Sequence, residues 1–287
     1  MQTYLDCIPC FFDQALRAGR IATDDEKKIK RLLDEIGMML KDIPLESTPP
    51  ETARLIYRKV REITGKYDPY KEIKNESTSK ALALYPALKK KVEASNDKLL
   101  TAIRIAIAGN VIDFGANRNF NIEEELDDIF KRDFAILDYD EFRNSLNETH
   151  EILYIGDNAG ECVFDKILIE EMKKPVIYIV RDMPVINDAI YEDAVQAGID
   201  KVATILSSGT DAPGTIVSTC SPEFKQIYNR STFIISKGQG NYEALSSEKR
   251  PIFFLLKTKC RVIANHIGSN EGDFVLKAVN TDSGRAG

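Results

Sequence analysis

Five short apolar runs in the second half of the chain end in turn residues and are separated by stretches with helical periodicity. The runs are EILYIG (151–156), PVIYIV (175–180), KVATIL (201–206), TFIISK (232–237) and PIFFLL (251–256). Continuous apolar runs are typical of strands buried on both faces, and the intervening helical stretches suit right-handed crossovers. The pattern predicts an α/β fold: a mostly parallel open sheet with helices on both faces, a Rossmann-like three-layer arrangement.

The first half of the chain has a different hydrophobic periodicity. Its apolar residues recur at three- and four-residue spacing, as in Leu32, Ile36, Met39 and Leu40. This spacing predicts helices, and no convincing strand is expected there. We therefore expect an all-helical subdomain over residues 1–148, forming one wall of a cleft. Residues 149–287 would form the sheet domain that carries the functional site.

Net charge and the length of the apolar runs limit the kinds of partner that the chain is expected to bind. The chain has 287 residues and a formal net charge of −6, without the basic face that nucleic-acid binding requires. No apolar run approaches the roughly 20 residues of a membrane span, and the start MQTYLDCIPC does not resemble a signal peptide. We expect a cytoplasmic protein with a small-molecule ligand and neither nucleic acid nor membrane as a partner.

Polar segments, most of them with glycine, follow four of the five predicted strands. Ligands of open α/β sheets bind at the carboxyl ends of the strands, so these segments should meet at one edge. The residues that they contribute are Asp157, Asn158, Glu161, Asp188, Ser208, Thr210, Asp211, Lys237, Gly238, Gly240, Asn241 and Glu243. Two or three carboxylates, an amide and an ammonium group on one edge indicate a metal and phosphate site.

Oxygen donors define the predicted metal ligands. Asp157, Asn158 and Asp188 would suit a hard divalent ion such as Mg²⁺ or Mn²⁺. Lys237 would complete a phosphate clamp, and Gly238 and Gly240 would let backbone N–H groups approach a phosphoryl oxygen. The simpler alternative is that the aspartates are N-caps and that Lys237 is a solvated strand end. The coincidence of four such segments at one edge favours the functional interpretation.

A polar pair also interrupts the apolar segment 99–116. Asn110 and Asp113 are three residues apart, so both can point the same way from a helix. They would line the cleft, or Asp113 would simply lie near the end of the helix at Gly115.

Several of these segments closely resemble the damage-control phosphatases formerly catalogued as domain of unknown function 89. The matching strings are GDNAGE (156–161), NDA (187–189), SKGQGNYE (236–243), CIPCFFDQALRA (7–18) and AGNVIDFGA (108–116). The resemblance implies metal-dependent hydrolysis of phosphate monoesters, with sugar phosphates or damaged phosphometabolites as substrates. The N-terminal Cys-x-x-Cys resembles the subfamily found in archaea and other microbes.

The resemblance also implies roles for individual residues. Asp157, Asn158 and Asp188 fall on the metal-ligand positions, and Lys237 falls on the phosphate-contacting position. Mn²⁺, Co²⁺, Ni²⁺ and Mg²⁺ are all accepted in the family, so the native ion stays open.

Candidate catalytic and binding roles follow from these assignments. The catalytic candidates are Asp157, Lys237, Glu161 and Asp113. Substrate contacts are expected from Asn110, Ser208, Thr210, Asp211, Gly238, Gly240, Asn241 and Glu243. Glu161, Asp113 or Asp211 would orient or deprotonate the attacking water, and covalent attack by Asp157 is an open variant.

The pair Cys7 and Cys10 forms only half of a zinc site, because no second such pair exists. A role for these thiols does not follow from the sequence. Two rival functions also stay open: a methyltransferase that uses S-adenosylmethionine, suggested by Gly156, Gly160 and Asp182, and a non-catalytic protein that binds a phosphometabolite. The physiological substrate and the oligomeric state are not indicated by any motif.

Overall fold

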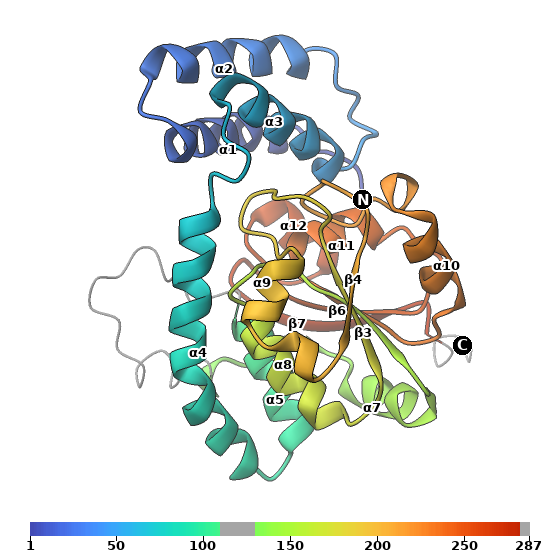
Figure 1. Cartoon of the computed structure of the whole chain (residues 1–287). Helices are drawn as coiled ribbons and strands as arrows, with labels where there is room; N and C mark the ends of the chain where they lie inside the picture. Colours follow the sequence, from blue (N-terminus) through green and yellow to red (C-terminus); the bar gives the residue numbers. More distant parts are fainter. Residues whose placement is uncertain (110–129, 282–287) are drawn as a thin grey trace.

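The computed structural model describes residues 1–109 and 130–281. Its centre is a seven-stranded sheet with the order β1-β7-β6-β5-β2-β3-β4 (Figure 1). The strands are β1 (Phe134–Leu137), β2 (Ile152–Ile155), β3 (Val176–Val180), β4 (Thr204–Ser207), β5 (Ile234–Lys237), β6 (Ile252–Lys257) and β7 (Phe274–Val279). β2 to β6 are mutually parallel, whereas β7 pairs antiparallel with β6.

Helices cover both faces of the sheet, as the sequence predicts. On one face, Tyr154, Tyr178 and Phe253 pack against α4 (Lys71–Glu93), α5 (Lys98–Ala108), α7 (Tyr139–Glu148), α8 (Cys162–Met172) and α9 (Tyr191–Gln196). On the other face, Leu153 and Phe254 pack against α10 (Pro222–Arg230), α11 (Gln239–Leu245) and α12 (Arg261–Ile267). The alternation of side chains along each strand sends neighbouring residues to these two cores. The three-layer α/β prediction is confirmed.

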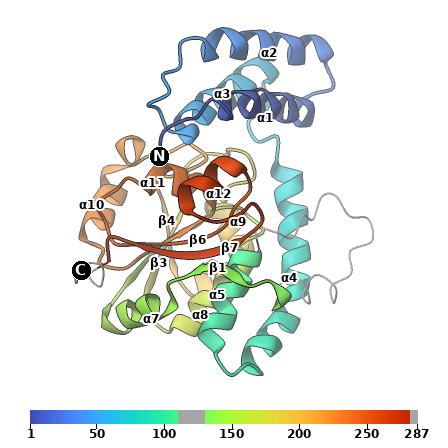
Figure 2. The same ribbon diagram turned by 180° about the vertical axis from the view of Figure 1, so that it is seen from behind.

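Three N-terminal helices form a further layer with its own core, which also takes in Val185 from the loop after β3. They are α1 (Cys7–Ala22), α2 (Glu26–Leu40) and α3 (Pro49–Thr64). α3 starts at a capping box, in which the Thr48 backbone N–H donates to Glu51 Oε2 at 2.6 Å. Figures 1 and 2 show this layer above α11 and α12, at the edge of the sheet domain.

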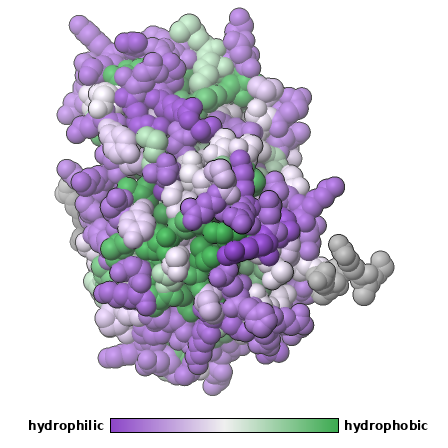
Figure 3. All heavy atoms as spheres, turned by 45° about the vertical axis from the view of Figure 1, so that its right-hand side comes forward, coloured by the Kyte–Doolittle hydropathy of each residue, from purple (hydrophilic) through white to green (hydrophobic). Residues whose placement is uncertain are grey.

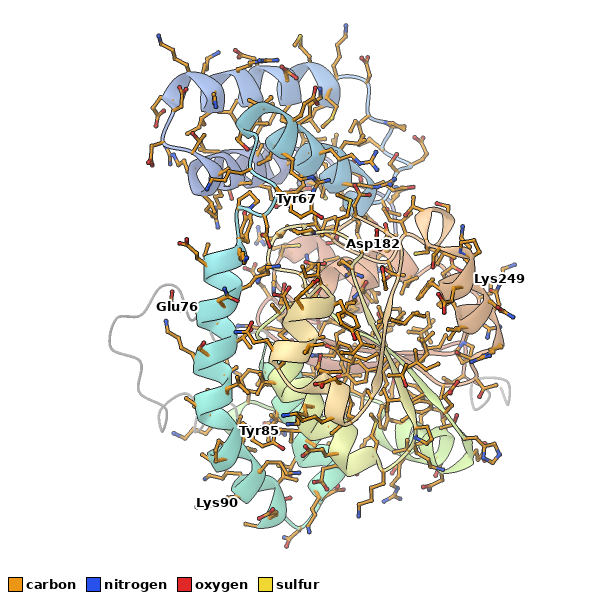
Figure 4. The ribbon with its side chains drawn as sticks, viewed as in Figure 1. Tyr67, Glu76, Tyr85, Lys90, Asp182 and Lys249 are labelled. Carbon is orange, nitrogen blue, oxygen red and sulfur yellow. The ribbon has the colours of Figure 1, made fainter. Side chains whose placement is uncertain are left out.

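The division of the chain differs from the expectation in two ways. Residues 1–148 are not wholly helical, because β1 joins the sheet by pairing in parallel with β7. β1 alternates half-buried and exposed residues, unlike the strands buried on both faces, and β7 carries Lys277 within its run. In addition, α4 and α5 were expected in the helical subdomain, but both pack on α8 of the sheet domain. Tyr85 of α4 donates to Glu170 at 2.7 Å, from the side of α4 that faces the sheet domain (Figure 4).

Within the described residues, no helix combines the length and apolar character needed to cross a membrane. On the face in Figure 3, hydrophilic side chains predominate above and below a central band of hydrophobic ones.

Candidate active site

A cavity of about 1570 Å³ lies at the carboxyl ends of the parallel strands, under the N-terminal helices. Its floor includes Asp157, Asn158, Glu161 and Asp188 from the loops after β2 and β3. Its outer walls come from α1, the first half of α3, the start of α4, and the segment from residue 259 to α12. The sheet edge that the sequence predicted to bind a ligand is therefore lined by the predicted carboxylates.

Backbone pairing holds the loops after β2 and β3 together. Asn158 and Asp188 form an isolated antiparallel bridge. The N–H of Ala159 donates to the carbonyl of Asn187 at 2.9 Å, and the N–H of Ala189 donates to the carbonyl of Asp157 at 2.7 Å. This pairing brings together the three residues predicted as metal ligands, although Asp157 and Asp188 are 31 positions apart in the chain.

Arg181 supports the carboxylates from inside the protein. Its side chain is almost fully buried, and its Nε donates to Asp188 Oδ2 at 2.8 Å. Its other nitrogens bond to Thr215 Oγ1 at 2.9 Å and Asn241 Oδ1 at 3.0 Å, and Nη2 lies 3.9 Å from Asp157 Oδ1. With its donors engaged, Arg181 fixes Asp188 and leaves the cavity side of the carboxylates accessible.

The floor carboxylates lie close together in buried surroundings, which disfavours their ionised forms. Burial, reinforced by Asp188, raises the pKa of Asp157 to about 6. Burial raises the pKa of Glu161 to about 7, although Lys237 opposes the shift, and burial also raises the pKa of Asp188. A divalent cation between these groups would favour their ionised forms, so the donors fit a hard metal ion.

Asn158 supplies the neutral donor of the set. Its amide NH₂ group donates to Glu161 Oε1 and, at 3.3 Å, to Asp157 Oδ2. This leaves the amide oxygen as the atom that can coordinate a cation. In the described part of the chain, no three His, Cys, Asp or Glu side chains are grouped to hold a metal ion. The predicted site has two carboxylates and an amide, so water or substrate must complete its coordination.

Lys237 is buried between carboxylates, and it does not line the cavity. Its Nζ lies 3.1 Å from Glu161 Oε2 and 2.5 Å from Asp165 Oδ1. The two oxygens of Asp165 also accept hydrogen bonds of 2.7 Å from Tyr154 and Tyr178. The geometry places Lys237 behind Glu161, whereas the sequence predicts a direct phosphate contact for it.

The turn after β5 is shaped by its glycines. Gly238 has φ +76°, and a Cβ there would overlap the carboxylate of Asp157. Gly240 lines the cavity, and a Cβ at this position would overlap the carbonyl oxygen of Pro213. The glycines predicted to approach a ligand therefore also permit the close approach of neighbouring protein groups.

Two further predicted residues of this turn have different surroundings. Glu243 lines the cavity, and burial raises its pKa to about 7 although the Gln239 amide donates to it at 2.9 Å. Asn241 is buried and makes protein contacts: its Nδ2 donates to the carbonyls of Gly156 at 3.0 Å and Lys237 at 2.8 Å. The structure brings Glu243 to the cavity but not Asn241.

The three candidate residues after β4 do not line the cavity. Ser208 and Thr210 are buried, and the Thr210 hydroxyl bonds to Thr219 at 2.7 Å. Asp211 instead pairs with three arginines of α3, as shown by its bonds to Arg54, Arg58 at 2.7 Å and Arg61 at 3.2 Å. Burial alone would raise the pKa of Asp211, but hydrogen bonds from Arg58 and Arg54 outweigh it and lower the pKa to about 2.

The predictions for Asn110 and Asp113 lie outside the described residues. Gly109, the residue before them, lines the cavity.

Three residues at or beside the site were not among the sequence candidates. Arg181 directly follows β3, so its position after a strand was an available signal. Asp165 lies four residues after Glu161, on the same side of α8. Lys259 lines the cavity and follows β6, the one apolar run that contributed no candidates.

The thiols of the N-terminal motif also lie at this cavity. Cys7, Cys10 and Cys260 line it, and all three are free. Gln14 Nε2 donates to Cys10 Sγ at 3.3 Å.

The fold and this cavity define an α/β protein with an acidic, oxygen-rich site at the carboxyl ends of parallel strands. Residues 3–275 match the family described as the damage-control phosphatase ARMT1-like domain. The chain belongs to this family.

Similar proteins span nearly the whole chain. A damage-control phosphatase of Archaeoglobus fulgidus is 34% identical, covering 95% of this chain and 98% of its own length. A damage-control phosphatase of Pyrococcus horikoshii is 33% identical, covering 96% and 97%. The crystal structure of a DUF89 family protein from P. horikoshii superimposes with a TM-score of 0.89, over 97% of this chain and 99% of that one.

Proposed function

We propose that this chain is a metal-dependent phosphatase that hydrolyses phosphate monoesters of small metabolites. The observation that carries the proposal is the grouping of Asp157, Asn158 and Asp188 on the floor of a cavity at the carboxyl ends of β2 and β3. The family and its named relatives support phosphatase activity. They favour it over the methyltransferase alternative.

The negative charge of the ionised floor carboxylates supports a requirement for a metal ion in substrate binding. A phosphate monoester is an anion, and the ionised side chains of Asp157, Glu161 and Asp188 would repel it. In our proposal, Asp157, Asn158 and Asp188 hold a divalent ion, with Mn²⁺, Ni²⁺, Co²⁺ and Mg²⁺ as the candidates. When bound, such an ion supplies Lewis-acid activation and neutralises phosphoryl charge.

Side chains of the protein would then accept the proton of the attacking water. Glu161 faces the cavity with a pKa raised by burial to about 7, which suits a general base near neutral pH. Asp211 suits this role less well, because three arginines stabilise its ionised form. Lys237, held by Asp165, keeps one oxygen of Glu161 in place, and Arg181 does the same for Asp188.

The assignment of Asp188 can be tested by substitution with alanine. Asp188→Ala should abolish hydrolysis of p-nitrophenyl phosphate and weaken Mn²⁺ binding measured by calorimetry. The matched control is Asp182→Ala on the same loop, whose exposed side chain bonds to Ser207 and does not line the cavity (Figure 4). Full activity in Asp188→Ala would remove Asp188 from the site.

A phosphate-release assay with and without EDTA separates an enzyme from a non-catalytic binding protein. An enzyme of the proposed kind releases phosphate with Mn²⁺ and stops when EDTA is added. A protein that binds the ester without releasing phosphate under any of the four ions would support the sensor alternative.

We also propose the finer assignments that the resemblance suggested. These are the microbial subfamily with the Cys7-x-x-Cys10 motif, sugar phosphates or damaged phosphometabolites as substrates, and a cytoplasmic location. A screen of sugar phosphates and nucleotides against the four ions tests the substrate assignment.

A further inference from the structure

The Cys7-x-x-Cys10 motif is the part of the sequence that the proposed mechanism leaves without a role. α1 begins at Cys7, so both cysteines lie in its first turn. Both are free thiols that line the cavity, and Cys10 is exposed whereas Cys7 is half-buried. A reagent that enters the cavity therefore reaches Cys10 first.

The spacing of the two cysteines suits an intramolecular disulfide. Side chains three residues apart share one face of a helix, with Cβ atoms about 5–6 Å apart. A disulfide needs about 4 Å between Cβ atoms, so the turn must tighten by about 1–2 Å. The Cys7 N–H donates outside the helix, to the Tyr4 carbonyl at 2.9 Å, and Pro9 has no N–H. Because the first N–H groups of a helix have no partner within it, the first turn can close a bridge without unfolding α1.

A third thiol lies beside the pair. Cys260 immediately precedes α12 and also lines the cavity. Burial is the main cause of the raised pKa of the Cys7 thiol, and the nearby Cys260 and Cys10 add to the shift. Within the described residues, no three His, Cys, Asp or Glu side chains are grouped to hold a metal ion, so the thiols are not arranged as a metal site. Cys260 belongs to the sheet domain and receives a hydrogen bond from Gln239 at 3.8 Å, whereas Cys10 shares a turn with Cys7 and is its expected partner.

We propose that Cys7 and Cys10 form a reversible dithiol–disulfide pair, which a small-molecule disulfide oxidises through the cavity and whose bridge lowers the activity of the site. The Cys10 thiolate attacks one sulfur of the reagent, whose S–S bond breaks; a mixed disulfide forms at Cys10 and one reagent thiolate leaves. The Cys7 thiolate then attacks the Cys10 sulfur, which forms the bridge and releases the second reagent thiolate. Two electrons pass from the cysteines to the reagent, and the two thiol protons end on its leaving thiolates. In the cytoplasmic location proposed above, thiols are kept reduced, so the bridge forms only under oxidation.

The bridge acts on the site through the cavity wall. Its formation tightens the first turn of α1, which is part of that wall. It also moves the Cys10 sulfur away from Gln14, whose Nε2 donates to it at 3.3 Å and which lines the cavity as well. A displacement of about 1 Å can lower a rate by about 100-fold where a wall positions a substrate, so we expect a loss of about 10-fold in kcat/KM. This effect on activity rests on the proposed phosphatase function, whereas formation of the bridge does not.

The test treats the full chain with oxidised glutathione in the presence of Mn²⁺. Peptide mapping should find a bridge between Cys7 and Cys10, with the mass lower by two hydrogen atoms, and kcat/KM for p-nitrophenyl phosphate should fall by about 10-fold. Dithiothreitol should reverse both changes. Cys10→Ser should form no bridge, and its kcat/KM should not respond to the oxidant. The matched control Cys260→Ser removes the third thiol, and it should form the bridge and respond as the wild type does.

The inference would be overturned by a bridge that includes Cys260, by a mixed disulfide that persists at Cys10, or by full bridging with unchanged kcat/KM. If the wild type releases no phosphate, the proposed function fails. Peptide mapping then still tests the bridge by itself.

Discussion

Asp165 shows how one residue can determine the state of a buried site. Its two oxygens accept from Lys237, Tyr154 and Tyr178, and it is fully buried. A buried lysine needs such a partner, because an uncompensated ammonium in the interior is strongly unfavourable. Asp165 therefore keeps Lys237 charged beside Glu161, although Asp165 does not line the cavity itself.

We expect Asp165→Asn to lower the free energy of unfolding by about 3–5 kcal/mol, since it breaks a buried charge pair. It should also reduce kcat, because Lys237 would no longer hold Glu161. Asp193→Asn is the matched control: Asp193 pairs with the equally buried Lys74 at 2.8 Å, away from the cavity. The control should lose stability but keep its kcat, and equal loss of kcat in both variants would contradict the prediction.

Gly238→Ala should reduce hydrolysis by displacing the Asp157 carboxylate. Alanine at φ +76° also adds backbone strain of about 1–3 kcal/mol. Gly65→Ala isolates the strain, because Gly65 has φ +75° and a Cβ added there would meet no atom within 4 Å. The unfolding temperature should fall in both variants, whereas kcat should fall only in Gly238→Ala. Normal kcat in Gly238→Ala would show that the turn tolerates the added carbon.

At the scale of elements, α3 is joined to the segment after β4 by Asp211. Arg54, Arg58 and Arg61 are spaced at four and three residues, so they share one face of α3 and meet the same carboxylate. The segment continues to Pro213, which lines the cavity with Pro50 of α3. The arginine cluster therefore holds the N-terminal layer against the sheet domain at the cavity rim.

The ion pairs of Asp211 should stabilise the protein only where Asp211 is ionised. Its folded-state pKa of about 2 lies below its ordinary value of 3.8, so the stabilisation is present above pH 4 and is lost as pH falls toward 2. Asp211→Asn should lower the unfolding temperature at pH 7, and the difference from the wild type should shrink between pH 4 and pH 2.5. A difference that stays constant over this range would contradict the assignment.

At the scale of the whole molecule, the cavity lies between the N-terminal layer and the sheet domain. Its walls combine α1, α3 and α12 with loops at the carboxyl edge of the sheet. A ligand that fills the cavity would therefore contact segments from both halves of the chain. Binding should stabilise the folded protein as a unit.

Mn²⁺ should raise the unfolding temperature more at pH 7.5 than at pH 5. Without a cation, the folded-state pKa values of Asp157 and Glu161 are raised to about 6 and about 7, chiefly by burial. The folded state then holds more protons than the unfolded state, so its stability falls as pH rises from about 4 to 7. A divalent ion offsets this loss where the carboxylates are ionised. Scanning fluorimetry measures the shift, and Asp188→Ala should abolish it.

The strands of the sheet follow from local pattern, and the prediction succeeded for all five continuous apolar runs. It did not extend to β1 and β7, because a half-exposed edge strand and a strand with an internal lysine lack the pattern of a strand buried on both faces. The position of the cavity was also predictable. Parallel strands joined by crossovers bring the segments at their carboxyl ends to one edge.

The sequence by itself determined the three-layer class, the edge that carries the site and the residue types available there. The tertiary structure decided which of those side chains face the cavity. Lys237 and Asp165 are 72 residues apart, and Arg58 and Asp211 are 153 apart, so no local pattern reports their pairing. A lysine after a strand looks the same in sequence whether it meets buried carboxylates, as Lys237 does, or an open cavity, as Lys259 does. Only the packing of distant segments distinguishes the two environments.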